Sequence, residues 1–407
     1  MAFAESLICR ECSRTYELGA LYYCEHCFGP LEVAYDTEAV AAHVSRENIA
    51  AGPPTLWRYA DMLPVEPTTA TDLGAGFTPL VRADRLAAEL GLGELWLKND
   101  SLNPTNSFKD RPVTVALAKA LEFGLKTVAC ASTGNLANSV AAHAARAGLG
   151  SYVFVPHDIE PSKIVATAAL GTVVRVDGTY DDVNRLCSQL DEEYSWGIVN
   201  VNLRPYYAEG SKTLAFETAE QLGWELPDHV VVPVASGALL TKIAKGFREL
   251  VDVGLVEPTK PVRISGAQAE GCSPVAVAFA EGTDDVRPQK PDTIAKSLAI
   301  GDPADGFYSL REVRASGGAV AAVSDAEIVD AMRTLARTEG ILTEPAGGVT
   351  VATLAKLAAE GRIGKSERVV AYITGHGLKT PEVFDSGTLE VIPATVGGFQ
   401  SAYENKE

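Results

Sequence analysis

The feature that most constrains the fold of this chain is a regular alternation of strand-like and helix-like segments. The predicted strands are Thr127–Ala131, Ser151–Val155, Thr172–Val176 and Ile198–Asn200 in a first block, and Val230–Val234, Arg263–Ala267 and Val369–Ile373 in a second. Helices are predicted between the strands of the first block and, elsewhere, at Thr37–His43, Thr213–Leu222, Leu239–Val251 and Asp325–Glu339. Such alternation is typical of parallel sheets with helices on both faces, and 407 residues allow two or three domains.

Polar, glycine-containing loops follow three of these predicted strands. They are Ser132–Ser139, Ala235–Lys242 and Thr374–Lys379, and the first two open predicted helices. A helix that begins with small polar residues presents free backbone N–H groups to an anion. Because ligands of parallel sheets collect at the carboxyl ends of the strands, the three loops predict one shared crevice.

Lys109 is the candidate catalytic residue. It follows a Pro104-Thr105-Asn106 turn and precedes a helical run predicted from Val113 to Phe123. The positive end of a helix dipole disfavours an ammonium group, which makes this lysine a candidate Schiff-base former. The alternative is a solvated helix start, which is the common role of a Lys-Asp-Arg triplet.

Cysteine spacing near the start of the chain is typical of a zinc ribbon. Cys9 and Cys12 form one Cys-x-x-Cys pair, and Cys24 and Cys27 form a second after a short hairpin. Four sulfur ligands leave no open position on the metal, so the predicted role of zinc is structural. A metal-free relic, a redox pair or disulfides are the alternatives.

Composition and charge limit the possible partners. The formal net charge of −18 disfavours binding to nucleic acid or to an anionic membrane, so an anionic substrate requires a local cluster of basic residues. No apolar run approaches the ~18 residues that span a bilayer. The first ten residues lack a basic stretch and an apolar core, so we expect a cytoplasmic protein.

Three motifs, in this order, resemble a known family. The first motif is Asn103-Pro104-Thr105 with Ser107-Phe108-Lys109-Asp110-Arg111, the second is Ser132-Thr133-Gly134-Asn135, and the third is Thr374-Gly375-x-Gly377-Leu378-Lys379. They resemble motifs of the threonine synthases. These belong to the fold type II, tryptophan-synthase-β-like enzymes that use pyridoxal phosphate. The resemblance implies an α/β fold with two doubly wound parallel-sheet domains and the cofactor in the cleft between them. It also implies a homodimer.

The expected domain organisation combines this resemblance with the ribbon. Residues 1–36 are the zinc-ribbon-like segment, 37–99 the connector and start of the large α/β domain, 100–204 the small α/β domain, 205–390 the large α/β domain and 391–407 a C-terminal tail.

The resemblance assigns cofactor roles to residues at the matching positions. Lys109 is expected to hold the cofactor as an imine and later to move protons. Asn135 is expected at the 3-oxygen of the ring, with a helix cap as the alternative. Thr374 is expected at the pyridine nitrogen. The cofactor phosphate is expected on the backbone of Ser236, Gly237, Ala238 and Leu239, for which a plain helix start is the alternative.

The reaction implied by the resemblance converts O-phospho-L-homoserine and water into L-threonine and phosphate. Donors for the substrate phosphate are expected among Ser132, Thr133, Lys163, Arg204 and Lys212. Arg204 has a surface position as its alternative. Four positions depart from the common pattern, namely Asn106, Pro112, Ala235 and His376. They leave open a β-replacement enzyme that acts on O-phosphoserine, of the cysteate synthase or diaminopropionate synthase type.

Overall fold

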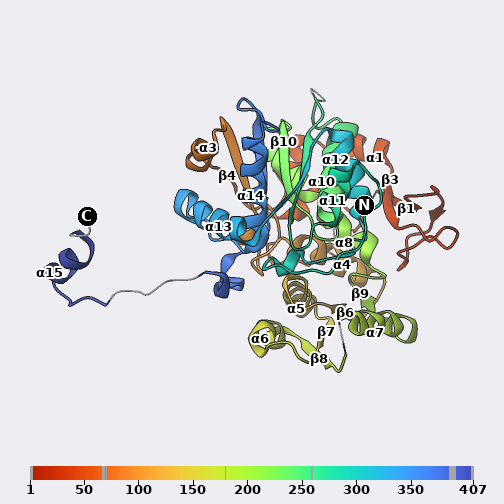
Figure 1. Cartoon of the computed structure of the whole chain (residues 1–407). Helices are drawn as coiled ribbons and strands as arrows, with labels where there is room; N and C mark the ends of the chain where they lie inside the picture. Colours follow the sequence, from red (N-terminus) through yellow and green to blue (C-terminus); the bar gives the residue numbers. More distant parts are fainter. Residues whose placement is uncertain are drawn as a thin grey trace.

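The described residues form three sheets, one small and antiparallel and two that form the bodies of α/β lobes (Figure 1). The computed structural model describes residues 3–66, 69, 71–178, 180–257, 260–384 and 391–404, without the side chains of 161–163, 180–181 and 191–192. None of the helices in these residues is both long and apolar enough to cross a bilayer.

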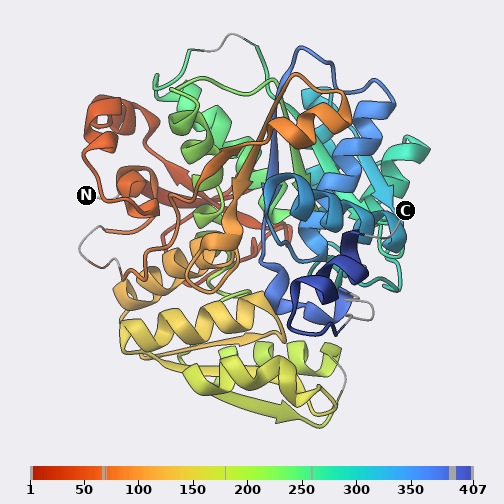
Figure 2. The same ribbon diagram turned by 90° about the vertical axis from the view of Figure 1, so that its left-hand side faces the viewer.

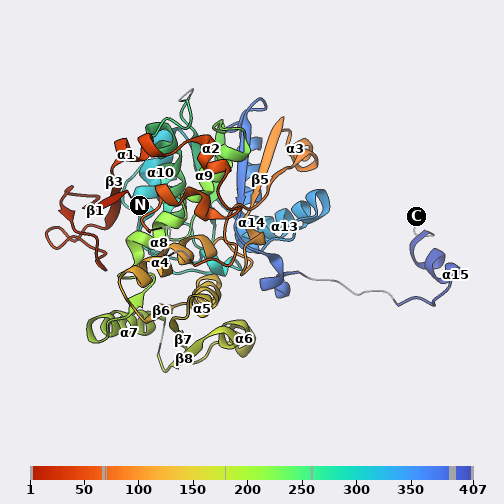
Figure 3. The ribbon, with the colours of Figure 1, turned by 180° about the vertical axis from the view of Figure 1, so that it is seen from behind.

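The N-terminal sheet carries the cysteine pairs. Strands β1 (Ala4–Cys9), β2 (Thr15–Tyr16) and β3 (Leu31–Tyr35) pair antiparallel in the order β2-β1-β3. Strand β3 lies against helix α8 of the main body, as Figure 3 shows from behind. The segment that follows contains α1 (Thr37–His43), α2 (Arg46–Ala50) and the 3-10 helix η1 (Leu56–Met62). Helix α1 begins where Asp36 accepts a hydrogen bond from Ala39 N, a common N-cap.

A parallel sheet in the order β8-β7-β6-β9 forms the smaller lobe, at the bottom of Figure 2. Its strands are β6 (Thr127–Ala131), β7 (Gly150–Pro156), β8 (Thr172–Val176) and β9 (Gly197–Ile198). The accompanying helices are α4 (Asp110–Glu122), α5 (Asn135–Ala147), α6 (Pro161–Leu170), α7 (Tyr180–Glu193) and α8 (Arg204–Gly210). Apolar side chains from α4, α5, β6 and β7 form one buried cluster, which fixes α4 and α5 against the sheet.

The larger lobe contains a six-stranded sheet in the order β12-β11-β10-β13-β5-β4. Its strands are β4 (Leu80–Arg82), β5 (Glu94–Asn99), β10 (His229–Pro233), β11 (Arg263–Ala269), β12 (Val320–Val323) and β13 (Arg368–Ile373). All neighbours are parallel except β4, which pairs antiparallel with β5. Because β10 and β13 are adjacent, with Val230 opposite Val370, the loops at their carboxyl ends also lie side by side.

Helices cover both faces of this sheet. One face packs against α3 (Asp84–Leu90), α13 (Asp325–Glu339) and α14 (Pro345–Ala359). The other packs against α9 (Thr213–Gln221), α10 (Ala238–Asp252), α11 (Pro274–Glu281) and α12 (Gly306–Ser316). The remaining elements are short: η3 (Asp100–Leu102), η4 (Lys296–Leu298), η5 (Gly377–Lys379), η6 (Pro381–Val383), α15 (Val396–Phe399) and the π-helical η7 (Gln400–Glu404). The predicted α/β class with parallel-sheet domains is confirmed.

Candidate active site

Lys109 lies at the start of α4, directly after a tight turn. Asn106 makes the turn with a φ of 60°, a conformation that asparagine adopts more readily than most residues. The helix begins at Asp110, three residues before the predicted start, so Lys109 is its N-cap. The Lys109 amine donates a hydrogen bond to the Tyr207 hydroxyl at 2.9 Å and lies 4.7 Å from the centre of the Phe108 ring. The half-buried amine is therefore held among aromatic groups rather than in free solvent.

The turn before Lys109 is bonded to the loop after β13. Phe108 N donates to Thr374 O at 2.9 Å, and His376 N donates to Asn106 O at 3.1 Å. From the same loop, the Lys379 amine donates to the carbonyl of Thr105 at 2.7 Å. Residues far apart in sequence thus form one short antiparallel contact, which brings the predicted Thr374 to the lysine turn.

Asp110 anchors the same turn from the other side. Its buried carboxylate accepts hydrogen bonds from Thr105 N at 2.7 Å, Thr105 Oγ1 at 2.8 Å and Ser139 Oγ at 2.7 Å, and contacts His143 Nε2 at 3.1 Å. Burial raises the pKa of Asp110, but the hydrogen bond from His143 and the other partners outweigh burial and lower it below its usual value. Since Ser139 and His143 belong to α5, this carboxylate ties the lysine turn to the small lobe.

Asn135 bridges the two lobes. It is the first residue of α5, and the residue before it, Gly134, is the N-cap. The Asn135 amide nitrogen lies 3.0 Å from both carboxylate oxygens of Glu344, at the start of α14. Burial raises the pKa of Glu344. A Cβ on Gly375 would lie 2.4 Å from the Glu344 carboxyl group, so any larger residue there would force the Glu344 side chain to move.

The turn predicted to hold phosphate has an unusual backbone. Gly237 has a φ of 96°, and a Cβ there would lie 2.4 Å from Ser309 Oγ. Ala238 begins α10, whose first N–H groups have no partner within the helix. Two hydrogen bonds support this turn. Asp305 N, from the residue before α12, donates to Ser236 O at 2.8 Å, and Ser309 Oγ, from α12, donates to Gly237 O at 3.1 Å.

The predicted substrate-binding residues fall in different places. Ser132 and Thr133 follow β6 and lead directly to Asn135, at the junction of the lobes. Arg204 begins α8 and donates to Asp305 Oδ2 at 2.6 Å, so it lies next to the phosphate turn. Lys163 is in α6, and its side chain lies outside the described part of the structure.

Lys212 points into a buried cluster of six charges at the seam with β3. Its amine lies 2.8 Å from Glu209 and 2.9 Å from Glu249, and it is fully buried. The cluster consists of the carboxylates of Glu32, Glu209 and Glu249 and the amines of Lys212, Lys242 and Lys245. The three carboxylates balance the three amines in charge. The Lys212 amine is already paired with two of these carboxylates, Glu209 and Glu249.

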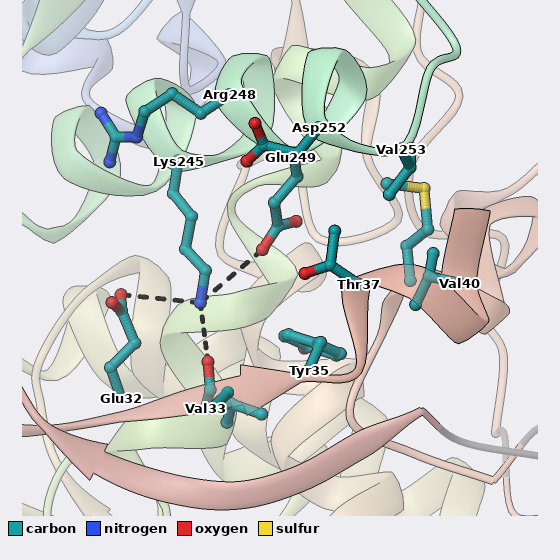
Figure 4. A pocket seen from close by; sticks show the side chains of 12 residues that line it. Glu32, Val33, Tyr35, Thr37, Val40, Lys245, Arg248, Glu249, Asp252 and Val253 are labelled. Carbon is teal, nitrogen blue, oxygen red and sulfur yellow. Dashed lines mark hydrogen bonds and ion pairs between the residues drawn. The ribbon is translucent and has the colours of Figure 1, made fainter.

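A cavity of about 300 Å³ opens beside this cluster (Figure 4). Lys245, Glu249 and Tyr35 line one part of it, whereas Val40 and Val253 form an apolar side. In Figure 4 the Lys245 amine is bonded to Glu32, Glu249 and the carbonyl of Val33. Lys109 is not among the residues that line this cavity.

The four N-terminal cysteines converge on one point. Their sulfur atoms all lie within 4.8 Å of one another, with Cys9 and Cys24 buried and Cys12 and Cys27 exposed. The two pairs form matching turns, in which Ser13 N donates to Cys9 O and Phe28 N donates to Cys24 O. Burial raises the pKa of Cys24, but hydrogen bonds, led by that from the Tyr16 hydroxyl, lower it to about 6. Four converging thiols are a donor set that suits a zinc ion.

Comparison with known proteins identifies the family. The sequence pattern of the family described as "Pyridoxal-phosphate dependent enzyme" matches residues 71–375. The threonine synthase of Methanocaldococcus jannaschii is 40% identical over 378 residues, which cover 92% of this chain and 93% of that protein. The threonine synthase of Methanosarcina acetivorans is also 40% identical, over 92% of each chain. The chain belongs to the threonine synthase family.

A solved structure supports the fold of this threonine synthase family member. The processed form of threonine deaminase isoform 2 from Solanum lycopersicum superposes with a TM-score of 0.66 over 88% of this chain and 96% of that one, at 22% identity. At that identity the likeness concerns the fold, which agrees with the expected fold type II architecture.

Sequence reasoning missed three residues that the structure places in or beside the site. Tyr207 bonds to the Lys109 amine, Glu344 bonds to Asn135, and Asp305 supports the phosphate turn. A Glu-Pro pair before a helix was an available signal for Glu344, because proline favours the first helical position. Tyr207 and Asp305 carry no local signal, since only tertiary packing brings them to the site.

Proposed function

We propose that this chain is a threonine synthase that converts O-phospho-L-homoserine and water into L-threonine and phosphate. The observation that carries this proposal is the 40% identity to threonine synthases that is maintained over 92% of the chain. The geometry around Lys109 is consistent with it, because the Lys109 turn is bonded to the Thr374 loop. Asn135 is linked to the same loop through Glu344, whose N–H donates to Gly375 O.

The residues at the junction of the lobes suit pyridoxal phosphate. When bound, this cofactor supplies the electron sink for proton removal next to an amino group. Lys109 would carry its aldehyde carbon, and Asn135 would contact the ring 3-oxygen. Thr374 would offer a neutral hydroxyl to the ring nitrogen. The left-handed turn at Gly237 is consistent with a phosphate cradle, in which Ser236, Gly237, Ala238 and Leu239 donate from the backbone.

Lys109 is the group that we propose moves protons. The proposed reaction removes protons from Cα and Cβ of the substrate, expels phosphate from Cγ and adds the hydroxyl of water at Cβ, and protons return to Cα and Cγ. The Lys109 amine would take and return these protons, while the Tyr207 hydroxyl at 2.9 Å fixes its position. A neutral partner at the ring nitrogen favours elimination and replacement over transamination.

The leaving phosphate of the substrate needs its own donors. We propose Ser132, Thr133 and Arg204 for this role, because the first two adjoin Asn135 and Arg204 lies beside the phosphate turn. Lys163 stays a candidate from the sequence. We leave Lys212 out of this set, because Glu209 and Glu249 already neutralise its buried amine.

We also propose that Cys9, Cys12, Cys24 and Cys27 bind a structural zinc ion. The support is the 4.8 Å limit on the distances between their sulfur atoms. With all four positions filled by thiolates, the metal has no place for substrate. One zinc per chain, released only when the thiols are blocked with a mercurial reagent, is the expected result of metal analysis. Disulfides, or thiols that titrate freely in the purified protein, would contradict it.

The proposed reaction is tested by incubating the holoenzyme with each phosphorylated amino acid. We expect equimolar phosphate and threonine from O-phosphohomoserine alone, and loss of both products and of the visible absorbance of the bound cofactor in Lys109→Ala. Release of phosphate only from O-phosphoserine, and only with sulfite or an amine present, would instead identify a β-replacement enzyme.

We further propose a cytoplasmic homodimer with the domain boundaries given by the sequence. Sedimentation at twice the 43.0 kDa of the chain is the expected result, and a monomer at working concentration would refute it.

A further inference from the structure

We infer that the metal site and the cofactor site are coupled, through Arg10, so that metal on the cysteines strengthens binding of pyridoxal phosphate. This inference rests on the proposed zinc site and the proposed phosphate turn. It goes beyond both, because it makes the ribbon a positioning device for the cofactor rather than a separate structural module.

The two residues between Cys9 and Cys12 are the ones that reach the main body. The Arg10 guanidinium donates to Asp305 Oδ1 at 3.1 Å and stacks 3.7 Å from the centre of the Tyr308 ring. The next residue, Glu11, accepts a hydrogen bond from the Tyr308 hydroxyl. Both side chains between Cys9 and Cys12, those of Arg10 and Glu11, therefore contact the start of α12.

The cysteine turn also fixes the backbone of these two residues. Glu11 N donates to Cys9 Sγ at 3.4 Å, and Arg10 N donates to Pro30 O at 3.1 Å. A metal that holds Cys9 and Cys12 together would lock the two peptides between them. Loss of the metal removes that constraint and releases Arg10 and Glu11 from a single orientation.

Asp305 carries the contact onward to the phosphate turn. Its side chain is only 7% exposed and accepts from Arg10 and, on the other oxygen, from Arg204 at 2.6 Å. Its backbone N–H donates to Ser236 O, and its carbonyl accepts from Ser309 Oγ, which also donates to Gly237 O. A Cβ on Gly237 would lie 2.5 Å from the Asp305 carbonyl, so the turn and Asp305 are in close contact.

This path is short and made of groups with defined geometry. Arg10 and Arg204 together fix the orientation of one buried carboxylate, and the backbone of that residue supports Ser236 and Gly237. If Arg10 moves away, the Asp305 carboxylate keeps only Arg204 of its two arginine partners. The support of the phosphate turn by Asp305 is then weakened. Backbone donors at a phosphate site bind less tightly when their geometry is not preorganised.

The test measures cofactor affinity rather than turnover. Apo-protein would be titrated with pyridoxal phosphate, with visible absorbance as the readout, in zinc-loaded and zinc-stripped forms. We expect zinc removal and Arg10→Gln each to weaken binding roughly 5- to 50-fold, a range typical of coupled sites. Arg10→Lys should recover part of the loss. Zinc removal from Arg10→Gln should add little, because the path is already broken.

The matched control is Arg248→Gln. Arg248 pairs with Glu312 at 2.6 and 3.0 Å, so it also ties α12 to the body, but about 15 Å along α10 from the turn. This variant should bind the cofactor as the parent does. Thermodynamic reciprocity requires a second result: bound pyridoxal phosphate must raise zinc affinity, measured by chelator competition, by the same factor.

The outcomes separate this inference from the proposed function. Equal cofactor affinity with and without zinc, or equal behaviour of Arg10→Gln and Arg248→Gln, would overturn the coupling while leaving the enzyme assignment intact. If no form binds pyridoxal phosphate, the proposed function itself fails. Unchanged affinity in Arg10→Gln with a loss on zinc removal would show that the metal acts by another route, which also rejects the role of Arg10.

Discussion

Replacing Asp110 with asparagine tests whether the lysine turn is held as the structure indicates. The carboxylate has four close partners, all buried or nearly so: Thr105 N, Thr105 Oγ1, Ser139 Oγ and His143 Nε2. An asparagine can keep one oxygen acceptor, but its amide NH₂ would then face the Thr105 N–H, donor against donor. A buried donor left without a partner costs about 1–3 kcal/mol.

The remaining partners also weaken, because they would bond to a neutral oxygen. Hydrogen bonds to a charged group contribute roughly 1 kcal/mol more than neutral ones, and three such bonds remain, so we expect a total loss of about 4–6 kcal/mol in the free energy of unfolding. Denaturation in urea, followed by tryptophan fluorescence, measures this loss through the shift of the midpoint. Ser139→Ala removes one donor and leaves the carboxylate, so its expected loss is only about 2 kcal/mol.

The pH dependence of the same variant gives a second check. Because the pKa of Asp110 is lowered in the folded protein, its contribution to stability is present above the usual pKa of an aspartate. That contribution disappears as the pH falls through the lowered value, so Asp110→Asn and the parent should converge in acid. A variant as stable as Ser139→Ala at neutral pH, or a constant difference down to strong acid, would refute the anchoring role.

Three further predictions concern the site and its surroundings. Tyr207→Phe should lower kcat about tenfold while keeping cofactor binding, because one hydrogen bond to the Lys109 amine is lost; an unchanged kcat would exclude that role. Burial raises the pKa of Glu344, so the folded state disfavours its ionised form. Glu344→Gln should therefore gain stability relative to the parent as the pH rises above the usual glutamate pKa. Melting curves of both proteins across pH would show no such trend if Glu344 is fully ionised in the folded protein. Lys212→Met should destabilise by roughly 3–5 kcal/mol in urea and keep its KM for the phosphorylated substrate, whereas a raised KM with normal stability would place Lys212 at the substrate.

Several strands and one helix of the fold could be predicted from sequence because their signals are local. The predicted Thr127–Ala131, Thr172–Val176 and Asp325–Glu339 coincide with β6, β8 and α13. Helix α13 has a clear start, a capping box formed by Ser324 and Glu327, which a reader of the sequence can recognise. Apolar runs bounded by turn residues and a capped helix need no tertiary information.

Helix α14 was not predicted, for a physical reason. Its sequence, Pro345–Ala359, begins with small residues and contains several β-branched ones, which have lower helix propensity. Its first ten residues are all buried, because it lies between α13 and the central strands of the large sheet. A helix that is apolar on all sides lacks the periodic pattern that identifies a surface helix. Packing alone stabilises it, and with it the position of Glu344.

The candidate site was predictable as a set of loops and not as a set of contacts. The loops that contain Lys109, Asn135 and Thr374 follow from motifs, whereas the partners of these residues do not. Lys212 illustrates what sequence cannot predict. As a basic residue in a matching motif, it looks available for phosphate. In the fold, however, three acidic residues from β3, α8 and α10 cluster with Lys212 and two other lysines. Charge pairing of this kind depends on which helices meet, and local sequence does not contain that information.

The contacts of the Lys109 turn explain why its amine can remain aligned between two lobes. Its turn is bonded to the large lobe through Thr374 and His376, and to the small lobe through Asp110 and α5. A rotation of one lobe against the other cannot move the amine freely, because it would have to break one of these two sets of bonds. Asn135 and Glu344 join the lobes at a second point, so a hinge motion must pivot near these contacts rather than across them.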